Sequence, residues 1–448
     1  MPNEYFATTQ EITKTADAIR RKTRDSNLIE WKNNTGFQDA IDSIEDTVVY
    51  GFHINSNESD PSAAVTYLAD AIGKTPVHMD YDSGVFDYGS WENVFFMPRP
   101  CMLKYNGIVD YYLDPNDYSK KADGTASDVA DDTYDGNAMM EWGQNGKRIW
   151  YKIVPDANDN TSASIYIADH QADEGFHAWS FYDYNGVLKD HFYTPIYNGS
   201  IDSNGKLRSI SGKTYSDLCQ SKTASQEVSA AELNNVDSDK GWYTEVYADV
   251  ILIDLLLILM AKSLNTQNVY GQGRCGQTAT ASSMLGTGTT DDKGLFWGSS
   301  ANTYAVKVLG MENWWGNQWR RYAGHVIIDY VNKYKMTRGR QDGSTADDYV
   351  QSATADDYNG YLTGATSPSS DNYITKMKFD ENSFQISEVG GTSTVYWCDY
   401  LYQNSGCNYA VRNGSASAPA NRVGTFCVST AFYLETSAWN IGTSLSYK

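Results

Sequence analysis

The sequence has few of the residues that build metal and redox sites. It contains six histidines and six cysteines among 448 residues, and no two cysteines form a CxxC pair. His170 and His177 are the only near neighbours among the histidines, and their spacing matches no metal-ligand pattern. We therefore predict no metal and no other cofactor, and expect reduced, buried thiols. A disulfide between Cys398 and Cys407 stays open, because spacing alone does not decide it.

Long hydrophobic runs are also missing. The N-terminal stretch MPNEYFATTQEITKTADAIRRK has no apolar core of the kind found in secretory signals, so none is expected. The longest apolar run, residues 250–261, is interrupted by Asp254 and is too short to span a bilayer. We expect a helix over 243–264 that is covered on every side, with Asp254 either exposed at a gap or paired. Membrane insertion is not predicted.

Basic residues are scarce relative to acidic ones. The chain has 35 Lys and Arg against 56 Asp and Glu, a net charge of −21. Phosphate groups would be repelled over most of such a surface, which argues against nucleic acid or an anionic membrane as a partner. By contrast, 34 tyrosines and 12 tryptophans are present. Their abundance indicates chiefly β-strands and, in second place, recognition surfaces.

The length and the local patterns predict an α+β fold in three parts. Residues 1–47 contain two short amphipathic segments that cannot form a core alone, so we expect a helical module for attachment or oligomerisation. Residues 48–144 read as a β-rich spacer with strand-like runs between turns. Residues 145–448 are expected to form a domain that displays a ligand-binding surface. A linker-like stretch rich in Ser, Lys and Asn lies within this domain at 211–240.

The segment over about 400–439 differs from the rest of the chain in the pattern of its residue types. Side chains of unrelated chemistry alternate with a frame of Gly, Cys, Phe and Asn, without the regular period of a packed core. Tyr, Ser, Asn and Arg on a fixed scaffold are typical of a binding surface. The candidate ligand-binding residues are Tyr400, Tyr402, Tyr409, Val411, Ser415, Ser417, Arg422, Ser429, Ala431, Phe432, Tyr433, Glu435 and Ser437.

Three motifs resemble one family. They are GMENWWGNQWRR at 310–321, VYWCDY at 395–400 and GTFCV…WNIGTSLS at 424–446. They are similar to the formylglycine-generating-enzyme-like branch of the C-type lectin fold, used by variable proteins of diversity-generating retroelements and by related phage tail proteins. The resemblance covers roughly 145–448 and implies a C-type lectin-like domain whose C-terminal segment is rewritten by mutagenic reverse transcription. The N-terminal segment looks like one that recurs in phage tail and baseplate proteins of Gram-positive gut bacteria.

The resemblance implies a non-enzymatic receptor-binding protein for host adhesion, made in the host cytoplasm and carried in the virion at the phage tail. Its expected partners are a host bacterial surface receptor, either protein or glycan, and other tail proteins. A homo-oligomer, by tail symmetry a trimer, is expected because linked weak contacts gain avidity. Two alternatives stay open, a structural tail or baseplate protein and a polysaccharide-degrading enzyme. No catalytic residue is predicted, and Glu312 is the first acid to test for the enzyme. The neighbouring tryptophans are expected to pack in the core.

Overall fold

The computed structural model describes residues 47–448 apart from 184, 237–240, 337–361, 404–407 and 434, and describes no side-chain surroundings at 145 and 408–411. The helical module expected over 1–47 thus lies outside the described residues, except for Thr47. The described residues form 26 strands and three α-helices, α3 (Ala224–Glu232), α4 (Tyr247–Ala261) and α5 (Thr266–Tyr270). The expected α+β class is wrong, because the many short aromatic and β-branched segments between turns pair as strands and make the fold mainly β.

Two of the larger sheets combine strands from distant parts of the sequence. The four-stranded sheet has the order β2 (Val65–Ala69), β1 (Val49–Ile54), β10 (Asp159–Ala168), β9 (Trp150–Asp156). The seven-stranded sheet has the order β14 (Trp242–Thr244), β26 (Leu445–Tyr447), β11 (Phe192–Pro195), β8 (Gly136–Trp142), β5 (Arg99–Lys104), β6 (Val109–Asp114), β7 (Asp117–Lys121). Each contains strands from both sides of the expected boundary between 144 and 145. The spacer and display residues therefore share sheets.

The third large sheet carries most of the C-terminal segment. Its order is β19 (Leu362–Thr366), β18 (Val331–Tyr334), β17 (Trp319–Ile328), β23 (Asn408–Arg412), β24 (Val428–Ser429), β22 (Tyr400–Tyr402), β20 (Asn372–Phe379), β21 (Phe384–Val389), with β25 (Ile441–Gly442) beside β17. The remaining strands form the pairs β3–β4 (His78–Asp80, Val85–Asp87), β12–β13 (Ser200–Ile201, Leu207–Arg208) and β15–β16 (Lys307–Val308, Met311–Glu312).

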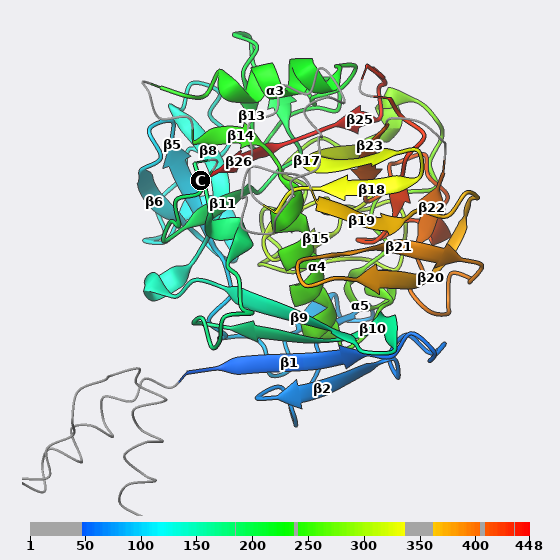
Figure 1. The fold of residues 1–448 in the computed structure, drawn as a ribbon. Coiled ribbons are helices and arrows are strands. Elements are labelled where there is room, and N and C mark those ends of the chain that lie inside the picture. Colours follow the sequence, from blue (N-terminus) through cyan, green and yellow to red (C-terminus); the bar gives the residue numbers. More distant parts are fainter. Residues whose placement is uncertain (1–46, 184, 237–240, 337–361, 404–407, 434) are drawn as a thin grey trace, which may run out of the picture.

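This nine-stranded sheet curves until the two ends of its order meet. Figure 1 shows β19 and β21 side by side, although no backbone ladder joins them. A side chain bridges the gap instead, because the backbone N–H of Ala365 donates to Oε1 of Gln385 at 3.2 Å. A sheet closed in this way exposes fewer unpaired strand edges. It therefore gives the C-terminal segment a firm frame.

The longest described helix, α4, is buried along its whole length, since all 15 of its residues are buried. The expected apolar helix is thereby confirmed, although it begins at Tyr247 and not at 243. Residues 242–244 instead form β14, which pairs with β26. The helix ends at Lys262, whose φ of 49° lies in the left-handed region. Among the described residues, no helix is long and apolar enough to cross a membrane.

Asp254 in the middle of α4 is paired, which was one of the two expected alternatives. Nη2 of Arg412 donates to its Oδ2 at 2.8 Å, and Oγ1 of Thr425 donates to its Oδ1 at 2.5 Å. Burial raises the pKa of Asp254 to about 7, against the opposing attraction of Arg412. Because Arg412 ends β23 and Thr425 precedes β24, these contacts tie the C-terminal segment to the central helix.

The tryptophans of the 310–321 motif pack in the core, as expected. Trp314, Trp315 and Trp319 are 1%, 0% and 5% exposed. The indole N–H of Trp314 donates to Oγ1 of Thr425 at 3.0 Å. In the same motif, Oδ1 of Asn317 accepts the backbone N–H of residue 285 at 2.7 Å, so Asn317 holds a loop that has no ladder partner there. The motif is thus a support for the surrounding loops.

Candidate ligand-binding surface

Four of the candidate residues belong to one cluster of contacts, in which Tyr400 is 8% exposed and Tyr402, Arg422 and Phe432 are partly exposed. The rings of Tyr400 and Tyr402 lie 4.7 Å apart between centroids, and the guanidinium carbon of Arg422 lies 4.2 Å from the Tyr400 ring. The ring of Trp319 lies 5.7 Å from Tyr402 and 6.4 Å from Phe432. We call this group, together with Tyr373 and the exposed residues of 431–437, the aromatic–arginine surface.

Strand pairing positions the tyrosines of this surface. Tyr400 and Tyr402 lie two residues apart on β22, so they share one face of the strand. Tyr373 of β20 is the direct cross-strand partner of Tyr400, and their rings meet edge to face at 5.1 Å. On the other side, Tyr402 lies opposite Ser429 of the parallel strand β24. The rings are therefore held by the sheet and not by a loose loop.

Arg422 ends the short 3₁₀ helix η5 (Ala420–Arg422) and is partly exposed. Partial desolvation lowers the pKa of its guanidinium, but the neighbouring Tyr400, Tyr402 and Tyr373 outweigh this effect and raise it. Stacking a guanidinium on an aromatic face is a favourable cation–π contact. The hydroxyls of Tyr402 and Tyr373 lie beside the edge of the guanidinium, whose remaining N–H groups can donate to another molecule.

The loop over 431–437 presents alternate side chains to solvent. Ala431, Tyr433, Glu435 and Ser437 are exposed, and Tyr433 reaches 48% exposure. Thr436 forms a local turn, because the backbone N–H of Tyr433 donates to its Oγ1 at 2.9 Å and its own N–H donates to the Tyr433 carbonyl at 3.0 Å. The carbonyl of Thr436 also accepts a hydrogen bond from Nη2 of the buried Arg321. The loop backbone is thus anchored while its exposed side chains stay accessible.

Not every candidate residue lies on this surface. Ser415 and Ser429 are 0% and 2% exposed, so neither reaches a ligand from outside. Ser429 lies on β24, which is paired with β22 and β23. Ser417 is partly exposed and lies 3.4 Å from Ser415 between hydroxyl oxygens. The side chains of Tyr409 and Val411 lie outside what the structure describes, although their backbones belong to β23.

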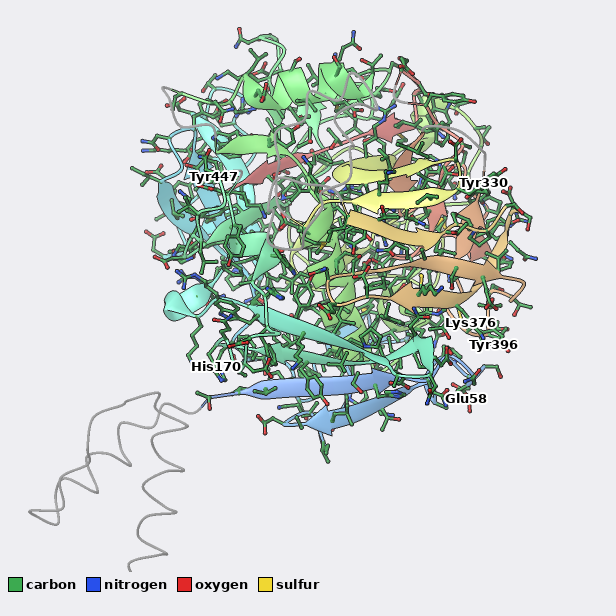
Figure 2. All side chains as sticks on the ribbon, in the orientation of Figure 1. Glu58, His170, Tyr330, Lys376, Tyr396 and Tyr447 are labelled. Carbon is green, nitrogen blue, oxygen red and sulfur yellow. The ribbon has the colours of Figure 1, made fainter. Side chains whose placement is uncertain are left out.

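Sequence reasoning missed Tyr373 and assigned Trp319 only to the core. Tyr373 reaches the surface through the pairing of β20 with β22, and its partner Tyr400 is far away in the sequence. No local pattern signals such a contact. The segment that connects β20 to β22 contacts the N-terminal part of the described chain. The backbone N–H of Tyr396 donates to the carbonyl of Ser59 at 2.8 Å, and Figure 2 shows Tyr396 near Glu58.

Glu312, the acid named for an enzymatic alternative, has a structural role. It is 1% exposed, and its carboxylate accepts from the backbone N–H of Gly288 at 3.0 Å and of Thr290 at 2.8 Å. Burial raises its pKa. Lys307 lies opposite Glu312 in the β15–β16 pair and donates through Nζ to the Thr290 carbonyl at 2.8 Å. These contacts hold the loop at 288–290 in place, and the carboxylate that makes them is itself buried.

Two observations concern the sulfur and metal chemistry of the described residues. Cys101, Cys219, Cys275, Cys398 and Cys427 are free and buried, and Cys407 lies outside the described residues. Within the described part of the chain, no group of three or more His, Cys, Asp and Glu residues is arranged to hold a metal ion. The question of a disulfide between Cys398 and Cys407, left open by the sequence, is not tested because Cys407 lies outside the described residues.

The curved sheet encloses one cavity that bears on ligand size. Its lining includes His325, Gln385 and Arg412, and it leaves about 20 Å³ to the centre of a water molecule. That space fits a water but no sugar or peptide side chain. Burial lowers the pKa of His325 to about 3, so the ring is neutral there. A larger ligand does not fit inside this cavity.

No protein-family model matches the chain, and no curated protein matches its sequence.

Proposed function

We propose that this protein is a non-enzymatic receptor-binding protein of a phage tail, which uses the aromatic–arginine surface for host adhesion. The motif resemblance to retroelement variable proteins and phage tail proteins supplies the biological setting. The observation that carries the proposal is the anchored loop over 431–437. Its backbone is pinned by Arg321 while Ala431, Tyr433, Glu435 and Ser437 face solvent beside a sheet-borne aromatic cluster.

Such a loop suits a surface whose chemistry varies. Exposed side chains change with little effect on the fold when the backbone is held by buried partners. Phe432 faces inward toward Trp319 and serves as a hydrophobic anchor of the loop. Rigid tyrosines beside adaptable Ser and Glu side chains combine large contact area with low entropy cost. Retroelement diversification, a trimeric assembly and attachment to other tail proteins belong to the same proposal.

Adhesion to whole cells tests the proposal. The fluorescently labelled full chain is incubated with a panel of Gram-positive bacteria, and bound protein is counted by flow cytometry. We expect binding to some strains, and we expect the double variant Arg422→Ala/Tyr433→Ala to lose it with an almost unchanged melting temperature. The control Ile108→Ala removes an exposed side chain, 61% exposed, from the turn between β5 and β6 and is expected to bind normally.

Two other outcomes decide against the proposal. Binding only to other virion proteins, with no adhesion to any cell, would favour the structural tail or baseplate alternative. Release of new reducing ends from a bacterial polysaccharide would favour the degrading enzyme. A large loss of stability in the double variant, with adhesion unaltered, would remove the aromatic–arginine surface from the function.

A further inference from the structure

Arg422 differs from the other arginines that the structure describes. Six of them form ion pairs with carboxylates: Arg99, Arg148, Arg208, Arg320, Arg321 and Arg412. Arg274 instead donates to the carbonyls of Ser283 at 2.7 Å and Thr303 at 2.8 Å. Among the described residues, the Arg422 guanidinium has neither kind of partner. It rests on the Tyr400 ring with its charge unneutralised.

An unpaired guanidinium is unexpected in so acidic a protein. Acidic residues outnumber basic ones by 56 to 35, so a carboxylate partner is available for every arginine. The sheet nevertheless places tyrosines around Arg422, and these support the cation without neutralising it. A planar guanidinium held on an aromatic face is oriented for a bidentate contact with a carboxylate or phosphate. The arrangement is that of a preorganised anion-binding group.

The surroundings favour a saccharide over a peptide as the carrier of that anion. Peptides often bind by adding a strand to a free sheet edge. Here β22 is paired on both sides, with β20 and β24, so no edge is free at this point. The surface instead offers ring faces, with Tyr433 48% exposed and Phe432 partly exposed. Flat aromatic faces beside hydroxyl groups suit the apolar faces and hydroxyls of sugar rings.

We propose that the aromatic–arginine surface binds an acidic saccharide, with Arg422 contacting its carboxylate or phosphate and the exposed ring of Tyr433 packing on a sugar residue. This inference deepens the proposed function by naming the ligand class, and it rests on that function for its biological setting. The net charge of −21 repels densely charged polymers. The saccharide therefore carries isolated acidic groups along a mainly neutral chain.

Matched probes test the acid group directly. Binding of the full chain is measured by isothermal titration calorimetry with three probes. They are a neutral hexasaccharide carrying a single glucuronic acid, the same hexasaccharide with that carboxyl group reduced, and the same hexasaccharide with a single phosphate ester in place of the carboxyl group. We expect at least one acidic probe to bind roughly tenfold tighter or more than the neutral one, as expected for one charge-assisted contact. The two acidic probes distinguish carboxylate from phosphate.

The variants assign the effect to Arg422. Arg422→Gln is expected to reduce binding of the acidic probe to the level of the neutral one. Arg422→Lys is expected to keep only part of the preference, because an ammonium group cannot make the bidentate contact. The control Arg148→Gln removes the same charge from a guanidinium that donates to the Lys189 carbonyl at 2.7 Å, and is expected to bind like the unmodified protein.

Several results would overturn the inference. They are equal binding of acidic and neutral probes, an acid preference that survives Arg422→Gln, and no measurable binding of either acidic probe. A glutamate-rich peptide that binds more tightly than both acidic probes would assign the surface to a protein partner. Cell adhesion that survives Arg422→Gln but is lost in Tyr433→Ala refutes the acid group and leaves the proposed function intact. Probe binding that depends on Arg422, without adhesion to any cell, supports the acidic-saccharide site and refutes the proposed function in host adhesion.

Discussion

Arginine side chains have different partners in the interior of this protein and on its outer surface. Inside, Arg320 and Arg412 are 1% and 3% exposed, and each is hydrogen-bonded to a buried carboxylate, Glu245 and Asp254. Outside, Arg422 lies on tyrosine rings with no carboxylate partner among the described residues. A buried charge without a partner is costly, whereas a partly hydrated one is not. The buried pairs therefore serve the frame, and the surface arginine is left available for a ligand.

Breaking an interior pair should have the largest effect. Arg412→Met leaves Asp254 buried without its cation, and we expect a loss of about 3–5 kcal/mol in the free energy of unfolding. Chemical denaturation measures this loss. The double variant Arg412→Met/Asp254→Leu removes both charges and is expected to recover much of the stability. A single variant as stable as the unmodified protein would contradict the role given to the pair.

The pH dependence of stability sharpens the same comparison. Burial raises the pKa of Glu227 to about 7 in the folded protein, with Arg321 opposing the shift. The folded state then binds more protons than the unfolded state between about pH 4 and 7, so this group's contribution to stability is lost as pH rises through 7. We expect a loss of about 2 kcal/mol between pH 5 and 8. Denaturation across this range should show a shallower slope for Glu227→Gln, and equal slopes would refute the prediction.

The anchor of the display loop gives an intermediate effect. Thr436→Val removes the hydroxyl that accepts the Tyr433 N–H at 2.9 Å. We expect a loss of about 1 kcal/mol in unfolding free energy. We also expect faster hydrogen exchange at the Tyr433 amide, measured by mass spectrometry of peptides covering the loop. Unchanged exchange in that peptide would mean that the turn does not depend on this bond.

Changes at the surface itself should cost the least stability. Arg422→Gln removes one partly exposed cation–π contact, with an expected loss of about 0.5–1 kcal/mol. Tyr433→Ala removes an exposed ring and is expected to change stability by less than about 0.5 kcal/mol. Thermal unfolding followed by circular dichroism checks both values. A loss from either variant as large as that of Arg412→Met would place the residue in the frame and not in the binding surface.

Local patterns in the sequence predicted several elements correctly. The apolar run at 250–261 predicted the buried helix α4, because a sequence that is apolar all round has to be covered on all sides. The cost of burying an unpaired charge predicted that Asp254 is either exposed at a gap or paired, and it is paired. The candidate residues Ala431, Tyr433 and Glu435 near the C-terminus are exposed, whereas their role in binding stays a prediction.

Other elements depended on contacts that no local pattern reveals. The stretch at 211–240 reads as a linker, yet α3 forms there, with Thr223 and Gln226 making a reciprocal cap at its start. The expected boundary after residue 144 is crossed by the pairing of β11 with β8 and of β1 with β10. Long-range strand pairing decided both the sheets and the fold class, which is mainly β and not α+β.

The sequence by itself determined which chemistry is present: an excess of acid, abundant tyrosine, scarce histidine and cysteine, and one long apolar stretch that folds as a helix. The tertiary structure alone decided which of these groups meet. It buried Ser429 between two strands, brought Tyr373 to Tyr400, and left Arg422 beside rings without an acid. The physical reason is the distance along the chain over which each interaction acts. Periodicity and turn chemistry act over a few neighbouring residues, whereas burial and pairing are set by strands far apart in the chain.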